Sequence, residues 1–371
     1  MIPRASAVLC LLAAAAAQAP ADTIRKKDGS SIRGVEVVSA TLTSTHYKKG
    51  TNTLEVAAHQ IADIEWGSVP EPFTSALLAM GRHDYEAAKQ LFGEAIDKTG
   101  RAILKADARF LQCKSAVFAA AANAGGAQDA VAALTSWIGE NADNWRIPEA
   151  MLLLGRARRL AGQAAEAAAT LQELDDRAIR EAWGPIWNAR AKFELALTYL
   201  GQEKGGDARA AFQAAGSSAE SALLQPSPAK AELEAIRVDS KVGEGETYFA
   251  EKDYARALSF FSSLTTERNP VLAAAGQAGV GQALYIQAAE SKNAADLRKA
   301  QIALATACVL DSASGETSAK ANYFLGKTLL ALGVEREGDS FKARANAYFR
   351  IVARHYPATR WAALAQAELA R

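Results

Sequence analysis

The sequence has almost no net charge. Its 371 residues include 42 lysines and arginines against 41 aspartates and glutamates, which gives a formal charge of +1. Arg4 belongs to a segment that we expect to be removed, and without it the two signs balance. A chain without net charge lacks the long-range field that gathers polyanions. We therefore expect neither nucleic acid nor an anionic membrane surface as a main partner.

Residues that bind metals or act as nucleophiles are also scarce. The four histidines are dispersed, the chain has only three cysteines, and it has no His-Glu-x-x-His or Cys-x-x-Cys motif. It also lacks a Gly-x-Ser-x-Gly motif, a Walker-type phosphate loop and a dinucleotide fingerprint after a strand. These absences predict no metal, no cofactor and no catalytic centre. We expect Cys113 and Cys308, far apart in apolar helical stripes, to be small buried side chains without a mutual disulfide.

Aromatic residues make up only 7% of the chain, and no later stretch reaches about 18 apolar residues without a charge. Alanine is the most frequent residue, and it favours helices while burying little surface. The composition thus predicts a mainly α protein with closely packed helices and no membrane span after the N-terminus. The length allows about two or three domains.

The first 21 residues have the layout of a secretory signal peptide. A basic start ending at Arg4 is followed by an apolar run, Ala5–Ala17, and then by small residues at Ala19 and Ala21. The alternative, a buried N-terminal helix, is disfavoured because the run has no polar face. We expect cleavage after Ala21, no stable membrane insertion of the mature chain, and a periplasmic or secreted location.

Residues 22–69 differ in sequence pattern from the rest of the chain after them. β-branched residues alternate with turns such as Asp28-Gly29 and Lys49-Gly50-Thr51-Asn52, which predicts four or five short strands. The pattern Ile24-x₄-Gly29-x₂-Ile32-x-Gly34-Val35, ending in Ile61-Ala62-Asp63-Ile64, resembles a small bacterial barrel of the Sm-like or SH3-like type. We expect a small β module that caps the rest of the chain or acts as a docking module.

Residues 70–371 show a helical pattern that repeats. Pro70 and Pro72 mark the boundary, and after them the motif Ala-x₃-Phe recurs at Ala88, Ala257 and Ala345. With a Gly-x-x-Tyr motif at Gly245 and a proline closing the last unit, this region resembles the tetratricopeptide repeat (TPR), and its last unit is similar to repeats of bacterial envelope proteins. The resemblance implies an α-solenoid of about seven TPR-like helix pairs and a final single helix. The aligned alanines of the second helices are Ala88, Ala133, Ala167, Ala211, Ala257, Ala300 and Ala345, spaced about 34 to 46 residues apart.

In a stack of this type, the first helices of the pairs line a groove that can hold a peptide or protein. Counting from the glycine positions places seven candidate partner-binding side chains there: Arg156, Arg159, Glu246, Gln282, Tyr285, Tyr323 and Lys327. Arg190, in the fourth unit, is an eighth candidate that this count does not fix. Arginine offers planar donors and tyrosine offers rigid amphipathic area, and both suit recognition. The other interpretation of each residue is ordinary exposed helix surface.

These features predict a non-catalytic scaffold of the periplasm or cell envelope that binds a protein or peptide partner. Two alternatives remain open. One is a periplasmic all-α enzyme or carbohydrate-binding protein, which would carry two buried groove carboxylates with raised pKa values. The other is a structural protein that associates with itself as a homo-oligomer.

Overall fold

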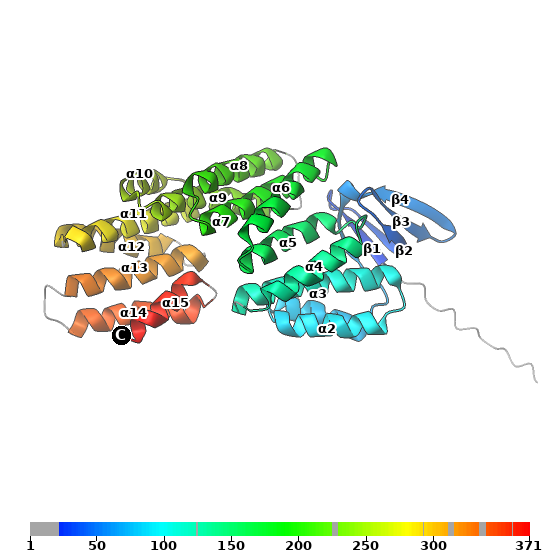
Figure 1. Cartoon of the computed structure of the whole chain (residues 1–371), viewed down its shortest axis with the longest axis horizontal. Coiled ribbons are helices and arrows are strands. Elements are labelled where there is room, and N and C mark those ends of the chain that lie inside the picture. Colours follow the sequence, from blue (N-terminus) through cyan, green and yellow to red (C-terminus); the bar gives the residue numbers. More distant parts are fainter. Residues whose placement is uncertain are drawn as a thin grey trace, which may run out of the picture.

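The computed structural model describes residues 22–123, 125–224, 229–291, 293–310, 315–333, 339–357 and 359–371. The predicted signal peptide, residues 1–21, lies outside these ranges. In Figure 1, a small sheet lies at one end of a curved array of helices.

The N-terminal module is a five-stranded antiparallel sheet with the strand order β4-β3-β2-β1-β5. The strands are β1 (Asp22–Lys26), β2 (Ser31–Ala40), β3 (Ser44–Lys49), β4 (Asn52–Ala57) and β5 (Ile61–Glu65). The predicted turn at Asp28 is present, since the Asp28 carboxylate accepts a hydrogen bond from the Ser30 backbone and Gly29 has a φ of 83°. The small core includes Ile24, Val35, Val37, Tyr47, Val56, Ile61 and Ile64.

The helical part forms seven successive helix pairs and a last single helix in the described residues. The helices are α1 (Glu71–Gly81), α2 (Tyr85–Lys98), α3 (Ala102–Asn123), α4 (Ala127–Glu140), α5 (Ile147–Leu160), α6 (Ala164–Arg180), α7 (Pro185–Gly201), α8 (Gly205–Leu223), α9 (Lys230–Ala250), α10 (Tyr254–Leu264), α11 (Pro270–Ser291), α12 (Ala294–Leu310), α13 (Gly315–Gly333), α14 (Asp339–His355) and α15 (Arg360–Leu369). The odd-numbered helices α1 to α13 are the first helices of the pairs. The predicted mainly α fold is confirmed.

Each second helix buries an alanine and, four residues later, a large apolar residue. These pairs are Ala88 with Phe92, Ala130 with Leu134, Ala167 with Leu171, Ala208 with Phe212, Ala257 with Phe261, Ala300 with Leu304, and Ala345 with Phe349, each residue at most 1% exposed. Residues four apart share one helix face, so a small and a large buried side chain lie next to each other on the packed face of each second helix. This pattern corrects two predicted positions. Ala133 is exposed, and Ala211 lies one turn beyond the fully buried Ala208.

Glycines in the first helices allow the two helices of a pair to approach closely. A β-carbon at Gly155 would lie 2.6 Å from Leu171, and one at Gly326 would lie 2.6 Å from the ring of Phe349. A gap of that size leaves no room for any side chain. Each of these two glycines therefore lies directly against the large residue of the second helix in its own pair.

The β module is fixed to the array by buried polar contacts. Asp22 is fully buried, and its carboxylate accepts hydrogen bonds from the backbone N–H groups of Val37 and Gly67, each at 2.8 Å. Arg101, just before α3, donates to both oxygens of the same carboxylate at 3.0 and 2.6 Å. The indole of Trp66 donates to Asp107 of α3 at 2.7 Å. A carboxylate with this many donors ties the sheet to one end of the helical stack.

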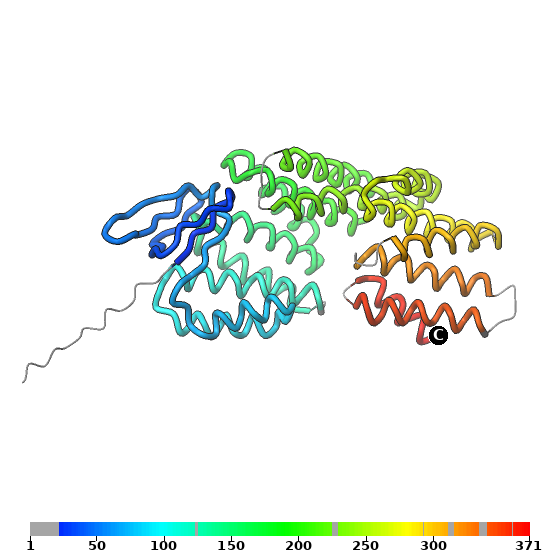
Figure 2. The backbone as a smooth tube through the Cα atoms, turned by 180° about the vertical axis from the view of Figure 1, so that it is seen from behind, coloured from blue at the N-terminus to red at the C-terminus, as the bar shows by residue number. Residues whose placement is uncertain are grey.

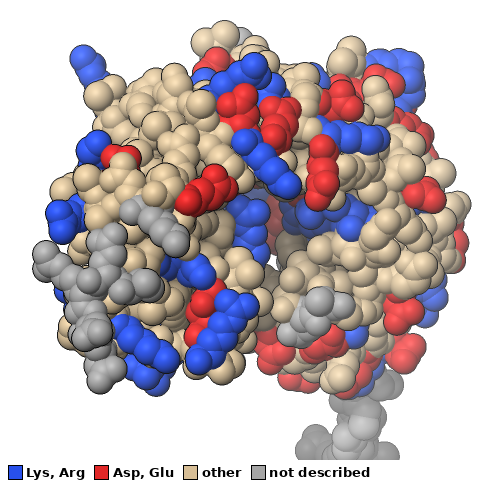
Figure 3. All heavy atoms as spheres, turned by 60° about the vertical axis from the view of Figure 1, so that its left-hand side comes forward, with Lys and Arg blue, Asp and Glu red and all other residues tan. Residues whose placement is uncertain are grey.

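The array bends into an arch. In Figures 1 and 2, the helices α2 to α5 form one arm and α13 to α15 form the other, with α7 to α9 joining them. Figure 3 shows a hollow between the two arms, with both basic and acidic side chains around it. None of the helices in the described ranges combines the length and apolarity needed to cross a bilayer.

Cys113 and Cys308, the two cysteines in the described residues, form no disulfide. Cys113 is buried and Cys308 is half-buried, and burial raises the pKa of each thiol to about 11. Both are therefore protonated at neutral pH and poor nucleophiles.

Candidate functional site: the first-helix face

Ion pairs connect the first helices α3, α5, α7 and α9 in succession, pass from α9 to α13 without a residue of α11, and continue to α15. We call the surface that carries these pairs the first-helix face. The predicted site residues all lie on α5, α7, α9, α11 and α13, and five of the eight form ion pairs with side chains of other helices.

Arg156 and Arg159 of α5 meet on one carboxylate, that of Glu194 on α7. Arg159 donates at 2.9 Å, and Arg156 donates through Nε at 2.8 Å and also through a terminal nitrogen. Burial of the Glu194 side chain, only 4% exposed, would raise its pKa, but the two guanidiniums outweigh burial and hold the pKa below its ordinary value. Glu194 is therefore ionised at neutral pH and holds both arginines in place.

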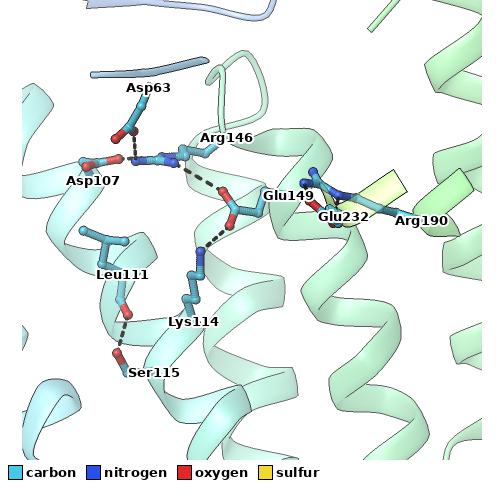
Figure 4. A network of polar contacts seen from close by, with 9 residues as sticks. All are labelled: Asp63, Asp107, Leu111, Lys114, Ser115, Arg146, Glu149, Arg190 and Glu232. Carbon is cyan, nitrogen blue, oxygen red and sulfur yellow. Dashed lines mark hydrogen bonds and ion pairs between the residues drawn. The ribbon is translucent and has the colours of Figure 1, made fainter. Parts of the chain in front are cut away.

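A second cluster joins the β module to α3 and α5 (Figure 4). Arg146 donates to Asp107 of α3 at 2.9 Å and lies 3.5 Å from Asp63 of β5. Glu149 accepts from Lys114 of α3 at 2.6 Å and contacts Arg146 at 3.3 Å. This cluster closes the end of the face on which the sheet is docked.

Arg190 of α7 extends the row to α9. It binds Glu232 in a bidentate pair at 2.6 and 2.5 Å, and its guanidinium lies 4.5 Å from the ring centre of Trp187. Figure 4 shows this pair beside Glu149. The bidentate geometry fixes the relative positions of α7 and α9.

Glu246 of α9 accepts from Lys320 of α13 and, at 3.2 Å, from Arg360 at the start of α15. Lys320 is only 5% exposed, and its ammonium lies 4.7 and 5.0 Å from the ring centres of Phe249 and Phe261. Burial lowers the pKa of Lys320, against the effect of Glu246. In Glu246, by contrast, burial would raise the pKa, and Lys320 and Arg360 outweigh it and lower the pKa.

The other predicted residues lie in the C-terminal arm. Lys327 donates to Glu368 of α15 at 2.8 Å. Tyr285 is half-buried and packs on Phe324, with 5.7 Å between the ring centres. Tyr323 is 9% exposed and packs on Phe349 and Trp361, so most of its ring belongs to the core. Burial raises the pKa of both tyrosines.

Gln282 of α11 is also mostly buried, at 7% exposure. Its Oε1 atom has no hydrogen-bond partner among the described residues. Nε of Arg159 is likewise buried and without a partner in the described part of the chain. Buried polar atoms in folded proteins are normally paired, so these two atoms are unsatisfied positions beneath the face.

Sequence reasoning missed the partners of the predicted charged residues. The partners Glu194, Glu232, Lys320 and Glu368 lie on other helices, namely α7, α9, α13 and α15, and their roles depend on how the helices are stacked. One signal was available within α9, where Glu232, Asp239 and Glu246 recur every seven residues and therefore share one helix face.

The enzyme alternative requires two buried groove carboxylates with raised pKa values. Desolvation raises the pKa of Asp239 on α9, of Glu316 on α13 and of Asp63 on β5, but these residues lie on three different elements, and Asp239 and Glu316 are exposed. The buried carboxylates Glu194 and Glu246 have lowered pKa values. The described residues also contain no group of three or more potential ligands that could hold a metal ion.

Solved structures share this architecture. A tetratricopeptide repeat protein from Parabacteroides merdae aligns with 81% of this chain and 96% of its own, at 14% identity and a TM-score of 0.51. The chain has a tetratricopeptide-repeat fold. The apo form of RapI aligns with 80% of this chain and 79% of its own, at 13% identity and a TM-score of 0.50. No family model matches the sequence of this repeat array, and no curated protein gives a significant sequence match.

Proposed function

We propose that the repeat array is a non-catalytic scaffold that binds a peptide or protein partner on the first-helix face. The observation that carries this proposal is the row of ion pairs on this face, which links α3, α5, α7, α9, α13 and α15. The fold supports it, because stacked helix pairs offer extended binding surfaces rather than a closed cavity.

The proposal extends to location in the periplasm or outside the cell, as part of the envelope. The signal-peptide pattern of residues 1–21 supports this. The contacts of Asp22 are compatible with cleavage after Ala21, because the buried carboxylate of residue 22 belongs to the fold itself. N-terminal sequencing of protein from a periplasmic fraction tests this part. A chain that begins at Asp22 supports it, and an intact Met1 contradicts it.

Partner capture tests the binding proposal. The tagged protein is used to capture partners from an envelope extract, and the eluate is identified by mass spectrometry. Arg190→Ala with Tyr285→Ala, both on the first-helix face, should remove the captured partner. A matched pair on second helices, Ile179→Ala in α6 with Ile302→Ala in α12, should retain it, although these side chains are 67% and 68% exposed.

Loss of the partner with the second-helix pair alone would contradict the proposal. Light scattering at several protein concentrations separates a partner-binding monomer from the self-associating alternative. A mass that rises with concentration in the wild type and falls to the monomer in the face variant would assign the face to a second copy of this chain.

A further inference from the structure

We infer that the centre of the first-helix face receives a lysine or arginine side chain of the partner at Asp239. This inference rests on the proposed function and adds the chemistry of the partner.

The basic side chains of the face are already paired with carboxylates of this chain. The pairs are Arg156 and Arg159 with Glu194, Arg190 with Glu232, Lys320 with Glu246, and Lys327 with Glu368. An acidic partner would have to displace one of these carboxylates, and a buried carboxylate left without its cation is strongly unfavourable. The predicted cations of the face therefore do not offer free sites for acidic groups.

Three acidic side chains on one side of α9 differ in whether they have an ion-pair partner. Glu232, Asp239 and Glu246 are spaced seven residues apart, so they form a row along one side of the helix. Glu232 is neutralised from α7 by Arg190, and Glu246 is neutralised from α13 and α15. Asp239, between them, forms no ion pair within the described ranges of the chain, and its side chain is exposed.

The surroundings of Asp239 favour a cation. Although its side chain reaches solvent, desolvation by the surrounding protein raises the pKa of its carboxyl group, and no neighbouring charge opposes this effect. A partly desolvated carboxylate gains more from a cation than one in open water, because solvent screens the pair less. Asp239 is thus the carboxylate of this row that can form an ion pair with a cation of the partner.

Gln282 lies on α11, which packs against α9. Its Oε1 atom is buried and has no donor among the described residues. Nε of Arg159 on α5 is also buried without an acceptor, and its guanidinium is already paired with Glu194. Within the described part of the chain, no cation is paired with Asp239, and a basic peptide supplies one.

Fluorescence anisotropy of the purified full chain tests the inference with three labelled ten-residue peptides. They alternate alanine with arginine, glutamine or glutamate and are measured at one fixed, near-physiological salt concentration. The arginine peptide should bind most tightly, and Asp239→Asn should weaken its binding about tenfold, the scale expected for one charged contact. Asp97→Asn, an exposed carboxylate on the second helix α2, makes the same charge change and should leave binding unaltered.

Asp239→Lys places a cation at the same position and should abolish binding of the arginine peptide. Both variants change an exposed side chain, and circular dichroism checks that they are folded. The inference is overturned if Asp239→Asn and Asp97→Asn bind alike, if the arginine peptide binds no better than the other two, or if none of the peptides binds. The partner capture described above remains a separate readout, so a partner held by the face but indifferent to Asp239 would remove this inference and keep the proposed function.

Discussion

The ring of Phe261 lies directly against Gly279, so that a β-carbon at residue 279 would overlap it. Phe261 belongs to α10 and Gly279 to α11, and the same ring also faces Gly245 of α9. One aromatic side chain thus fills the space between two successive helix pairs, and the glycines set how closely the pairs stack.

Replacement of Gly279 by alanine should destabilise the protein. The added methyl group cannot fit without moving the ring or the helices, and overpacking of this kind costs about 1–3 kcal/mol. Gly216→Ala is the matched control, because a β-carbon there would lie at an ordinary 3.6 Å from Ser240. The control should be stabilised by about 0.4–1 kcal/mol. Urea unfolding of both variants measures the difference, and equal stabilities would contradict the packing model.

The corrected register of α4 can be tested with two substitutions three residues apart. Ala130 is fully buried and Ala133 is exposed. Ala130→Leu should lower the free energy of unfolding by about 1–3 kcal/mol, whereas Ala133→Leu should change it by less than about 0.5 kcal/mol. Thermal melting, monitored by circular dichroism, shows which of the two variants is less stable. A larger effect at Ala133 would restore the alignment predicted from the sequence.

Loss of the Glu194 carboxylate should weaken the link between α5 and α7. In Glu194→Gln, Arg156 and Arg159 lose the group that neutralises both, and breaking a buried ion pair costs about 3–5 kcal/mol. Glu173→Gln, at an exposed position on α6, removes the same charge and should have little effect. Hydrogen exchange of α5 and α7 should report the loss. Unchanged protection in Glu194→Gln would show that the triad does not hold these helices.

Stability should fall in acid because of the same carboxylates. Glu149, Glu194 and Glu246 have folded pKa values below the ordinary 4.5. A lowered pKa adds stability that is fully present above pH 4.5 and is lost as the pH falls through the folded pKa, because the unfolded chain then binds more protons. The free energy of unfolding should therefore decline below about pH 4.5, and less steeply in Glu194→Gln. Parallel pH profiles for the two proteins would contradict this assignment.

The fold was predictable because it is encoded within single helices. The pattern of an alanine followed four residues later by a large apolar residue, as in Ala257 and Phe261, recurs along the chain. The four-residue spacing indicates a helix, and its recurrence gives the repeat period. The register failed at Ala133 and Ala211, where several alanines share one helix and composition alone does not show which one faces the core. In α8, the choice of Ala208 follows from Phe212 four residues later, a signal that the sequence already contained.

The candidate site was predictable only in part. Arg156 and Arg159 could be placed on a first helix by counting, but their partner Glu194 acts from a neighbouring helix, as Glu232 does for Arg190. Their pairing depends on the stacking of helix pairs, which no pattern within one helix specifies. The burial of Tyr323 and of Gln282 has the same origin. Tyr323 of α13 packs on α15, and Gln282 lies on α11, which packs against α9. Neither contact is visible in the sequence of a single helix.

Site-specific photo-crosslinking tests the central claim most directly. A photo-reactive phenylalanine analogue is placed at Tyr285, on the first-helix face, or at Ile302, on the second helix α12, and the protein is irradiated in an envelope extract. The account predicts a discrete crosslinked partner from position 285 and none from position 302. A crosslink from position 302 with none from position 285 would contradict it.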